Sequence, residues 1–206
     1  MKSILSLIIV LLVLLTSCGE QVVNPEKINS LPPVFPDYTG VTIPASIAPL
    51  NFVLTTNYEQ IDVTITGKGG VIHLQESRVA AISPKEWSAL LDKSKGDSLQ
   101  VIVAAKENGK WEQYLPFSVY VSSEPIDYGL VYRLIAPGYE VWSKMGIYQT
   151  ELHTAEQSTI LDNKLMAPNC MNCHTFPKNN PKKMSLHIRG ANGATALVQD
   201  KNIEML

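Results

Sequence analysis

The stretch "LQVIVAAKENGKWEQY", residues 99–114, decides the fold class. Its first half is rich in Val, Ile and Ala, and its second half combines Trp and Tyr with polar residues, a composition typical of β-strands. Between the halves, Asn108 and Gly109 can adopt the positive φ angles that a tight turn between antiparallel strands requires. The stretch therefore predicts a β-hairpin.

Similar short runs lie on both sides of the hairpin. They are rich in Val, Ile, Thr and Tyr, and turn residues separate them. The runs are LNFVLTT (50–56), IDVTITG (61–67), GVIHLQ (70–75), LQVIVAAK (99–106), KWEQYLPFSVYV (110–121), GLVYRLI (129–135) and VWSKMGIYQT (141–150). Seven short strands at this spacing predict a mainly β fold, an immunoglobulin- or fibronectin-like β-sandwich over residues 50–155.

One helix is expected between these strands, in "SPKEWSALLDKSKG" at residues 83–96. Ser83 is a candidate N-cap, and Pro84 suits the first turn because its missing N–H would have no partner there. Glu86 would complete a capping box with Ser83, and Gly96 can end the helix.

The start of the chain, "MKSILSLIIVLLVLLTSC", has the order of an export signal. Lys2 gives a positive start, and an apolar run over residues 4–15 is too short to span a bilayer comfortably. "LTSC" resembles the lipobox of bacterial lipoproteins, which implies a signal peptide over residues 1–17 and a lipidated N-terminus at Cys18. We therefore expect a protein of the cell envelope, anchored by lipid to the outer membrane on its periplasmic or surface side. A conventional signal peptide is the alternative.

Residues 18–49 are rich in proline, which removes backbone donors and favours extended conformations. The prolines are Pro25, Pro32, Pro33, Pro36, Pro44 and Pro49. The composition predicts a tether between the anchor and the sandwich. An irregular strand packed on the following domain is an equal alternative, because Val34, Phe35, Tyr38 and Val41 can all pack.

Charge and motifs exclude several function classes. The net charge is −2 and charged residues make up 17% of the chain, so no broad basic surface is available for nucleic acid. The sequence contains no nucleophile elbow, phosphate-binding loop or H-E-x-x-H helix, so an enzyme is the least favoured of the function classes. Trp87, Trp111 and Trp142 could form a sugar-stacking platform, although burial in a sandwich core explains them more simply.

A cluster of chemistry-bearing residues lies in "APNCMNCHTFPKNNPKK", residues 167–183. Cys170, Cys173 and His174 form the C-x-x-C-H pattern of c-type haem attachment. Two thiols at this spacing can each add to one vinyl group of a haem, while the adjoining imidazole becomes the fifth iron ligand. One covalent haem c is therefore the expected cofactor.

Two other interpretations of the C-x-x-C-H motif remain open. The cysteines could form a local or redox disulfide, although a thioredoxin-like motif needs a βαβ unit and a helix that starts at Cys170. They could also bind another metal with His174 and His187, although a structural zinc site normally needs four ligands.

The motif lies in a predicted irregular segment, residues 156–190, whose last part contains two candidates for the sixth iron position, Met184 and His187. Alternation in "MSLHIRG" places Met184, Leu186 and Ile188 on one face and the residues between them on the other. The Met184 face is apolar and suited to packing on the sandwich, so His187 is favoured as the sixth iron ligand. Positive charges at Lys182, Lys183 and Arg189 could then neutralise haem propionates.

Four stretches, "FPDYTGVTIPASIAPLNF", "YEVWSKMGIYQ", "NCMNCHTF" and "MSLHIRGANGAT", resemble the N-terminal half of a family of Gram-negative lipoproteins. These proteins pair such a region and one C-x-x-C-H motif with a C-terminal TolB-like β-propeller. The resemblance implies haem-linking roles for Cys170 and Cys173 and an iron-ligand role for His174. Residues 191–206 are predicted to form two short strands around Asp200, Lys201 and Asn202, like the opening of a first propeller blade that then stops.

Two function classes follow. The first is a lipid-anchored monohaem protein that transfers electrons in the cell envelope to a redox partner protein. The second is an envelope lipoprotein that binds a glycan or a protein and whose cysteine loop is a disulfide or metal staple.

Overall fold

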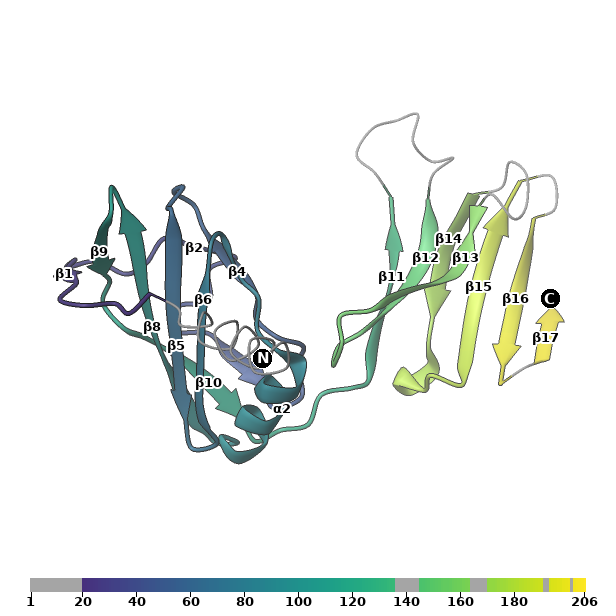
Figure 1. Cartoon of the computed structure of the whole chain (residues 1–206). Helices are drawn as coiled ribbons and strands as arrows, with labels where there is room; N and C mark the ends of the chain where they lie inside the picture. The colour runs from purple at the N-terminus through teal and green to yellow at the C-terminus, as the bar shows by residue number, and fades with distance from the viewer. Residues whose placement is uncertain (1–19, 136–144, 164–169, 191–192, 201) are drawn as a thin grey trace, which may run out of the picture. The chain divides into compact units, whose positions relative to one another are not determined.

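A computed structural model describes residues 20–135, 145–163, 170–190, 193–200 and 202–206. The chain forms two compact units, residues 1–126 and 127–206. Both units are mainly β, as the sequence predicts (Figure 1). No helix in the described part of the chain is long and apolar enough to cross a membrane.

The first unit contains ten strands and one α-helix among its described residues. The strands are β1 (Glu26–Lys27), β2 (Val34–Phe35), β3 (Thr42–Pro44), β4 (Phe52–Leu54), β5 (Gln60–Gly67), β6 (Gly70–Glu76), β7 (Val79–Ala80), β8 (Asp97–Glu107), β9 (Lys110–Gln113) and β10 (Phe117–Ser122). The helix α2 spans Pro84–Lys93.

These strands form a β-sandwich. The larger sheet contains β1, β9, β8, β10 and β3, with β5 and β6 beside β8, and the smaller sheet has the order β2-β4-β7. Side chains from both sheets and from α2 share one hydrophobic core, which includes Phe52, Val63, Leu91 and Val103. Because burial of these apolar side chains drives folding, the predicted sandwich is confirmed for this part of the chain.

The predicted hairpin is present. Strands β8 and β9 pair antiparallel, and Glu107 lies opposite Lys110 at the turn. Asn108 and Gly109 have φ angles of 51° and 75°, the left-handed values that this turn requires.

The proline-rich segment packs on the sandwich, which is the alternative to a free tether. Strand β1 pairs parallel with β9, and β3 pairs parallel with β10. Val34 and Ile43 are buried in the main core. The described part of the segment, from Glu20 onward, therefore belongs to the first unit.

Helix α2 covers the core through Trp87, Leu90 and Leu91, all of which are buried. The Trp87 indole N–H donates to the carbonyl oxygen of Ile47 at 3.0 Å. The predicted capping box is wrong in its first half, because Ser83 makes no side-chain hydrogen bond at the N-terminus.

The turn between β5 and β6 lies against α2. A Cβ atom at Gly69 would lie 2.7 Å from the Cα atom and the carbonyl oxygen of Leu90. Only glycine permits this approach, because the neighbouring atoms belong to the helix backbone.

The tryptophans of the sandwich are core residues. Trp87 and Trp111 are 3% and 7% exposed, which removes both from a surface sugar platform. Trp142 lies outside the described residues.

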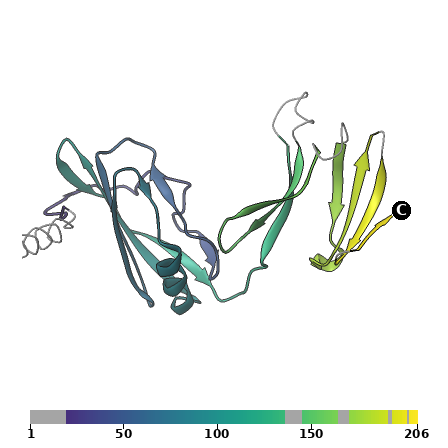
Figure 2. The ribbon, with the colours of Figure 1, turned by 45° about the vertical axis from the view of Figure 1, so that its right-hand side comes forward.

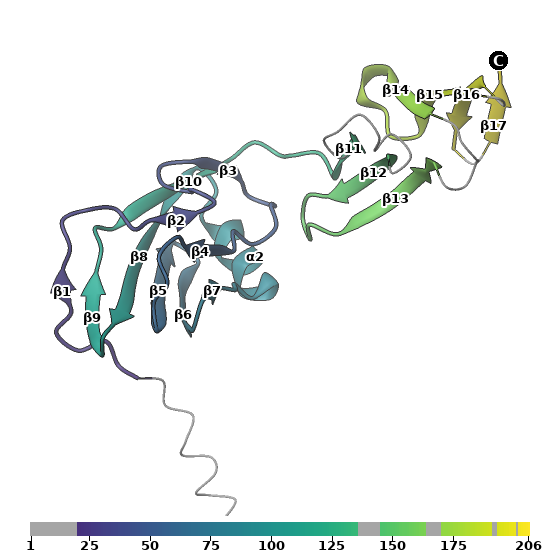
Figure 3. The same cartoon turned by 90° about the horizontal axis from the view of Figure 1, so that it is seen from above.

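The second unit contains seven strands and one short 3-10 helix among its described residues. They are β11 (Gly129–Leu134), β12 (Gly146–Glu151), β13 (Gln157–Asp162), β14 (Cys170–Thr175), η3 (Pro177–Asn179), β15 (Lys183–Arg189), β16 (Ala194–Gln199) and β17 (Asn202–Met205). Two sheets result, with the orders β11-β12-β13 and β14-β15-β16-β17 (Figures 2 and 3).

A small core joins these two sheets. Ile147 of β12 packs with Met184, Leu186 and Ile188 of β15. Strands β11 and β12, expected in the sandwich, thus lie in the second unit. The segment 156–190 is also more regular than predicted, because it contains β13, β14 and β15. The two predicted terminal strands are present as β16 and β17.

Candidate functional site

The C-x-x-C-H motif forms strand β14, which lies at one edge of its sheet and pairs only with β15 among the described strands. The pairing register shifts between Met171 and Cys173. Such a β-bulge inserts one extra residue and changes which side chains share a face.

The bulge determines the two faces of the motif. Cys170 lies opposite Arg189, and Cys173 lies opposite His187. Because directly opposed residues project from the same face of a sheet, both cysteines occupy positions on the His187 face. Regular alternation would instead have separated Cys170 from Cys173.

His174 belongs to the other face. It lies opposite Leu186, which is 5% exposed and part of the small core. Its imidazole ring is half-buried and meets the ring of Phe176 edge-on, with 6.4 Å between the ring centroids. Phe176 in turn packs against the same core. His174 therefore faces the interior of the unit.

The two thiols are free and differ in their surroundings. Cys173 is exposed, whereas Cys170 is half-buried with its Sγ atom 3.9 Å from the Sδ atom of Met145. Met145 itself is 3% exposed. Reagents from solvent thus reach Cys173 more readily than Cys170.

The two candidates for the sixth iron position lie on opposite faces of β15. Met184 is buried with Leu186 and Ile188, which confirms the predicted apolar face. His187 is half-buried, and its Nδ1 atom lies 2.9 Å from the hydroxyl oxygen of Thr195 on β16. Thr195 was not singled out from the sequence, since only the strand pairing brings it beside His187.

An open cavity of about 640 Å³ lies on the Met184 side of the sheet. This volume falls within the usual range of small-molecule sites, roughly 300–1,000 Å³. Its walls combine apolar and charged side chains, including Leu130, Phe176, Met184, Lys182 and Asp200. No local sequence pattern indicates this cavity, because its residues come from five separate segments.

The two thiols of β14 are suited to covalent attachment of a haem. Both sulfurs are unpaired, and Cys173 is accessible. The imidazole of His174 faces away from them, so it can serve as an iron ligand only if the chain turns locally after Cys173. An edge strand with a bulge needs to break hydrogen bonds on one side only for such a turn.

Two further predictions concern a metal site and the lipidation site. Across the described segments, no group of three or more His, Cys, Asp or Glu side chains is placed to hold a metal ion. The predicted lipidation site, Cys18, lies outside the described residues.

Comparison with models of known protein families finds no match, and no curated protein matches the chain. The motif and its surroundings therefore provide the basis for the proposed function.

Proposed function

We propose that the chain is a lipid-anchored protein of the cell envelope that carries one c-type haem and transfers electrons. Cys170 and Cys173 would hold the haem through thioether bonds, and His174 would ligate the iron. A haem held in this way supplies a one-electron carrier. The observation that carries the proposal is a complete C-x-x-C-H motif with two free thiols on an edge strand.

The chain's own residues would have distinct roles in this function. Cys173 is accessible for the first thioether bond, and Cys170 follows from its half-buried position beside Met145. The side chains of Lys182, Lys183 and Arg189 are exposed near the motif and would pair with haem propionates or with an acidic redox partner. Cys18 would anchor the protein to the outer membrane.

For the sixth iron position we propose His187 rather than Met184. Iron-ligating histidines normally bind a second group through the other ring nitrogen, which fixes the ring. The contact of His187 Nδ1 with Thr195 supplies such a group and leaves Nε2 available. A second imidazole gives a lower reduction potential than a methionine sulfur.

Export of the full chain in cells with a haem-attachment system tests the proposal. The wild-type protein is expected to show a haem-stained band on a denaturing gel, and Cys170→Ser combined with Cys173→Ser is expected to lose it. Ser185→Ala, a change on the neighbouring strand that removes no sulfur, is the control. A band that persists in the double variant contradicts haem attachment at this motif.

Two further variants test the ligand and the anchor. His187→Ala should change the visible spectrum of the oxidised protein, whereas Met184→Ala should leave the iron coordination unchanged. Loss of a methionine-to-iron charge-transfer band in Met184→Ala alone would reverse the assignment. Cys18→Ala should move the protein out of the membrane fraction, and unchanged lipid labelling would contradict lipidation at this residue.

A second candidate function is an envelope binding protein in which the cysteines form a disulfide staple. The observation that favours it is the bulge, which gives both cysteines positions on one face and His174 a position on the other. Intact mass of the exported protein separates the two functions. Covalent haem adds the mass of the group, whereas a disulfide lowers the mass by two hydrogens.

A further inference from the structure

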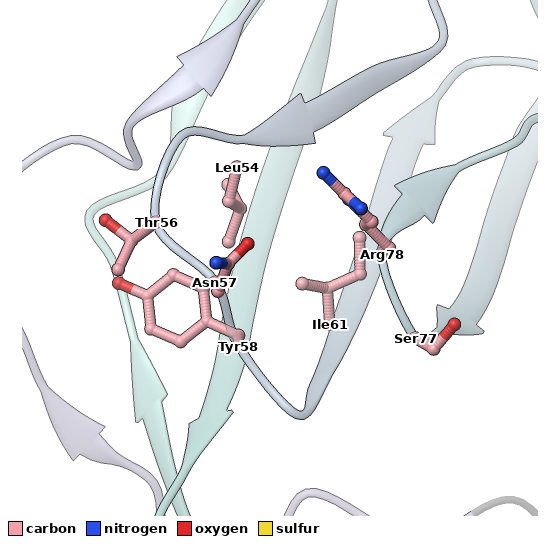
Figure 4. A pocket seen from close by; sticks show the side chains of 7 residues that line it. All are labelled: Leu54, Thr56, Asn57, Tyr58, Ile61, Ser77 and Arg78. Atoms are coloured by element: carbon pink, nitrogen blue, oxygen red, sulfur yellow. The ribbon is translucent and has the colours of Figure 1, made fainter.

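A small pocket lies at one end of the sandwich, far from the cysteine motif in sequence. Its volume is about 60 Å³, and seven residues line it: Leu54, Thr56, Asn57, Tyr58, Ile61, Ser77 and Arg78 (Figure 4). Leu54 ends β4 and Ile61 lies in β5, and the other five residues belong to two connections, β4 to β5 and β6 to β7. Each connection passes from one sheet of the sandwich to the other.

The sheet register explains why these connections meet. Ile61 near the start of β5 lies opposite Glu76 at the end of β6. The segment before Ile61 and the segment after Glu76 must therefore leave the sheet side by side. Asn57 and Arg78, one from each segment, thus line the same pocket.

The pocket is held in shape by contacts outside it. The backbone N–H of Thr55 donates to the Pro33 carbonyl at 2.8 Å, and that of Glu59 donates to the Lys106 carbonyl at 2.9 Å. The hydroxyl of Tyr58 lies 2.5 Å from that of Tyr114, which fixes the Tyr58 ring. A preformed site binds without first ordering its loops.

The lining has an apolar part and a cationic part. Leu54 and Ile61, which are 8% and 1% exposed, supply the apolar part. Arg78 supplies the cationic part, and Figure 4 shows it above Ile61. Arg78 takes part in none of the four ion pairs found among the described residues. Its guanidinium is thus available to an anion from solvent.

Size and chemistry together select the ligand class. A water molecule needs roughly 10–15 Å³ measured in this way, so the pocket has room for a group about four to six times as large. A carboxylate on a short carbon stem has this size. Its planar oxygens match the fork of an arginine, and its carbon stem suits Leu54, Ile61 and the Tyr58 ring.

We propose that this pocket binds a small carboxylate, with Arg78 pairing to its oxygens and the Asn57 side-chain amide donating a further hydrogen bond. The site is independent of haem attachment, because all its residues belong to the first unit. The same carboxylate chemistry occurs in a free short-chain acid, an acidic sugar and the C-terminus of a peptide.

Titration of the full chain with propionate, followed by amide NMR, tests the proposal. Saturable shifts are expected for residues 56–58 and 77–78. Arg78→Gln should raise the Kd at least tenfold, whereas Arg133→Gln, which removes an exposed arginine of the second unit, should leave it unchanged. Absence of saturable shifts, or an equal Kd in Arg78→Gln, overturns the proposal.

Further probes identify the source of the carboxylate. Glucuronate that binds more tightly than propionate indicates an acidic sugar, and N-acetylalanine that does so indicates a peptide C-terminus. If neither does, the ligand is a free short-chain acid. Inorganic phosphate that binds as tightly as propionate contradicts the carboxylate class.

A second variant guards against misfolding of Arg78→Gln. Asn57→Ala alters only an exposed loop side chain and should also weaken propionate binding while the amide spectrum of β5 and β8 stays unchanged. If Asn57→Ala binds propionate with an unchanged Kd, the hydrogen bond assigned to Asn57 is contradicted, and Arg78 alone recognises the carboxylate.

Discussion

The two units of the chain bury very different amounts of apolar surface. In the first unit, twenty-two buried side chains from two sheets and a helix form one cluster. In the described part of the second unit, the corresponding cluster has four buried side chains. Apolar burial is the main favourable contribution to folding, so the first unit is the rigid scaffold and the second is the part that local changes can reshape.

This difference matches the chemistry proposed for each unit. The cysteine motif lies on an edge strand of the unit with the small core. The carboxylate pocket lies on loops fixed at both ends by the unit with the large core. Covalent modification needs a segment that can open, whereas recognition of a small anion benefits from a site that does not move.

The largest expected effect is in the first unit, for Trp87→Ala. The substitution removes a side chain that is 3% exposed and should lower the free energy of unfolding by about 3–5 kcal/mol. Trp87→Phe keeps most of the volume but loses the hydrogen bond to Ile47, at a cost of about 0.5–1.5 kcal/mol from that bond. Urea unfolding measures both. Equal losses would mean that packing of the ring contributes little.

Ile147→Ala tests the second unit. Ile147 is fully buried and joins the two sheets, so we expect a loss of about 2–5 kcal/mol. Hydrogen exchange should rise at β12 and β15 and stay low at β5 and β8. Ile203→Ala, at a side chain that is 69% exposed, should change stability by less than about 0.5 kcal/mol. Increased exchange throughout both units would show that they unfold together.

Gly69→Ala tests the fit between the β5–β6 turn and α2. The new Cβ would lie 2.7 Å from backbone atoms of Leu90, which cannot rotate away, and we expect a loss of about 1–3 kcal/mol. At Gly67 the nearest atoms are the side-chain atoms Leu99 Cδ2 and Ser94 Oγ, so Gly67→Ala should cost less. Thermal unfolding of the two variants compares them, and the reverse order would contradict this account.

The smallest expected effect concerns a surface carboxyl of the first unit. A hydrogen bond from Lys68 lowers the pKa of Asp97 below its ordinary value of 3.8, and the backbone N–H of Ser98 lowers it further. A lowered folded-state pKa stabilises the protein above the pKa that the carboxyl has in the unfolded chain, and this stabilisation is lost as the pH falls through the folded pKa.

NMR titration of Lys68→Gln checks this assignment. The Asp97 pKa should rise toward its ordinary value but stay below it, because the Ser98 contact remains. Lys95→Gln, which removes a lysine paired with Asp92 instead, should leave the Asp97 pKa unchanged. A pKa that does not move in Lys68→Gln would assign the whole shift to Ser98.

Much of the first unit could be predicted because its signals are local. Asn108 and Gly109 specify a turn by their own backbone preferences, and Pro84 specifies the start of a helix. The sequence did not show which strands belong to which unit. Residues 129–135 have the same composition as the sandwich strands, and only tertiary packing assigns them to the second unit.

The candidate site was predictable in its residues but not in its arrangement. Spacing identified Cys170, Cys173 and His174, and alternation identified the apolar face of β15. The bulge between Met171 and Cys173 depends on how β14 pairs with β15, which no local pattern encodes. It decides that His187, rather than His174, shares a face with the cysteines.

The parallel pairing of β3 with β10 also has a mechanical consequence. Strand β3 follows only the two-residue strands β1 and β2, which a pulling force reaches first, and β10 is the last strand of the unit. A force that pulls Glu20 and Ile126 apart draws two parallel neighbours in opposite directions along their axes. The hydrogen bonds between them are then loaded together in shear instead of opening one after another, so this short ladder acts as a clamp against tension.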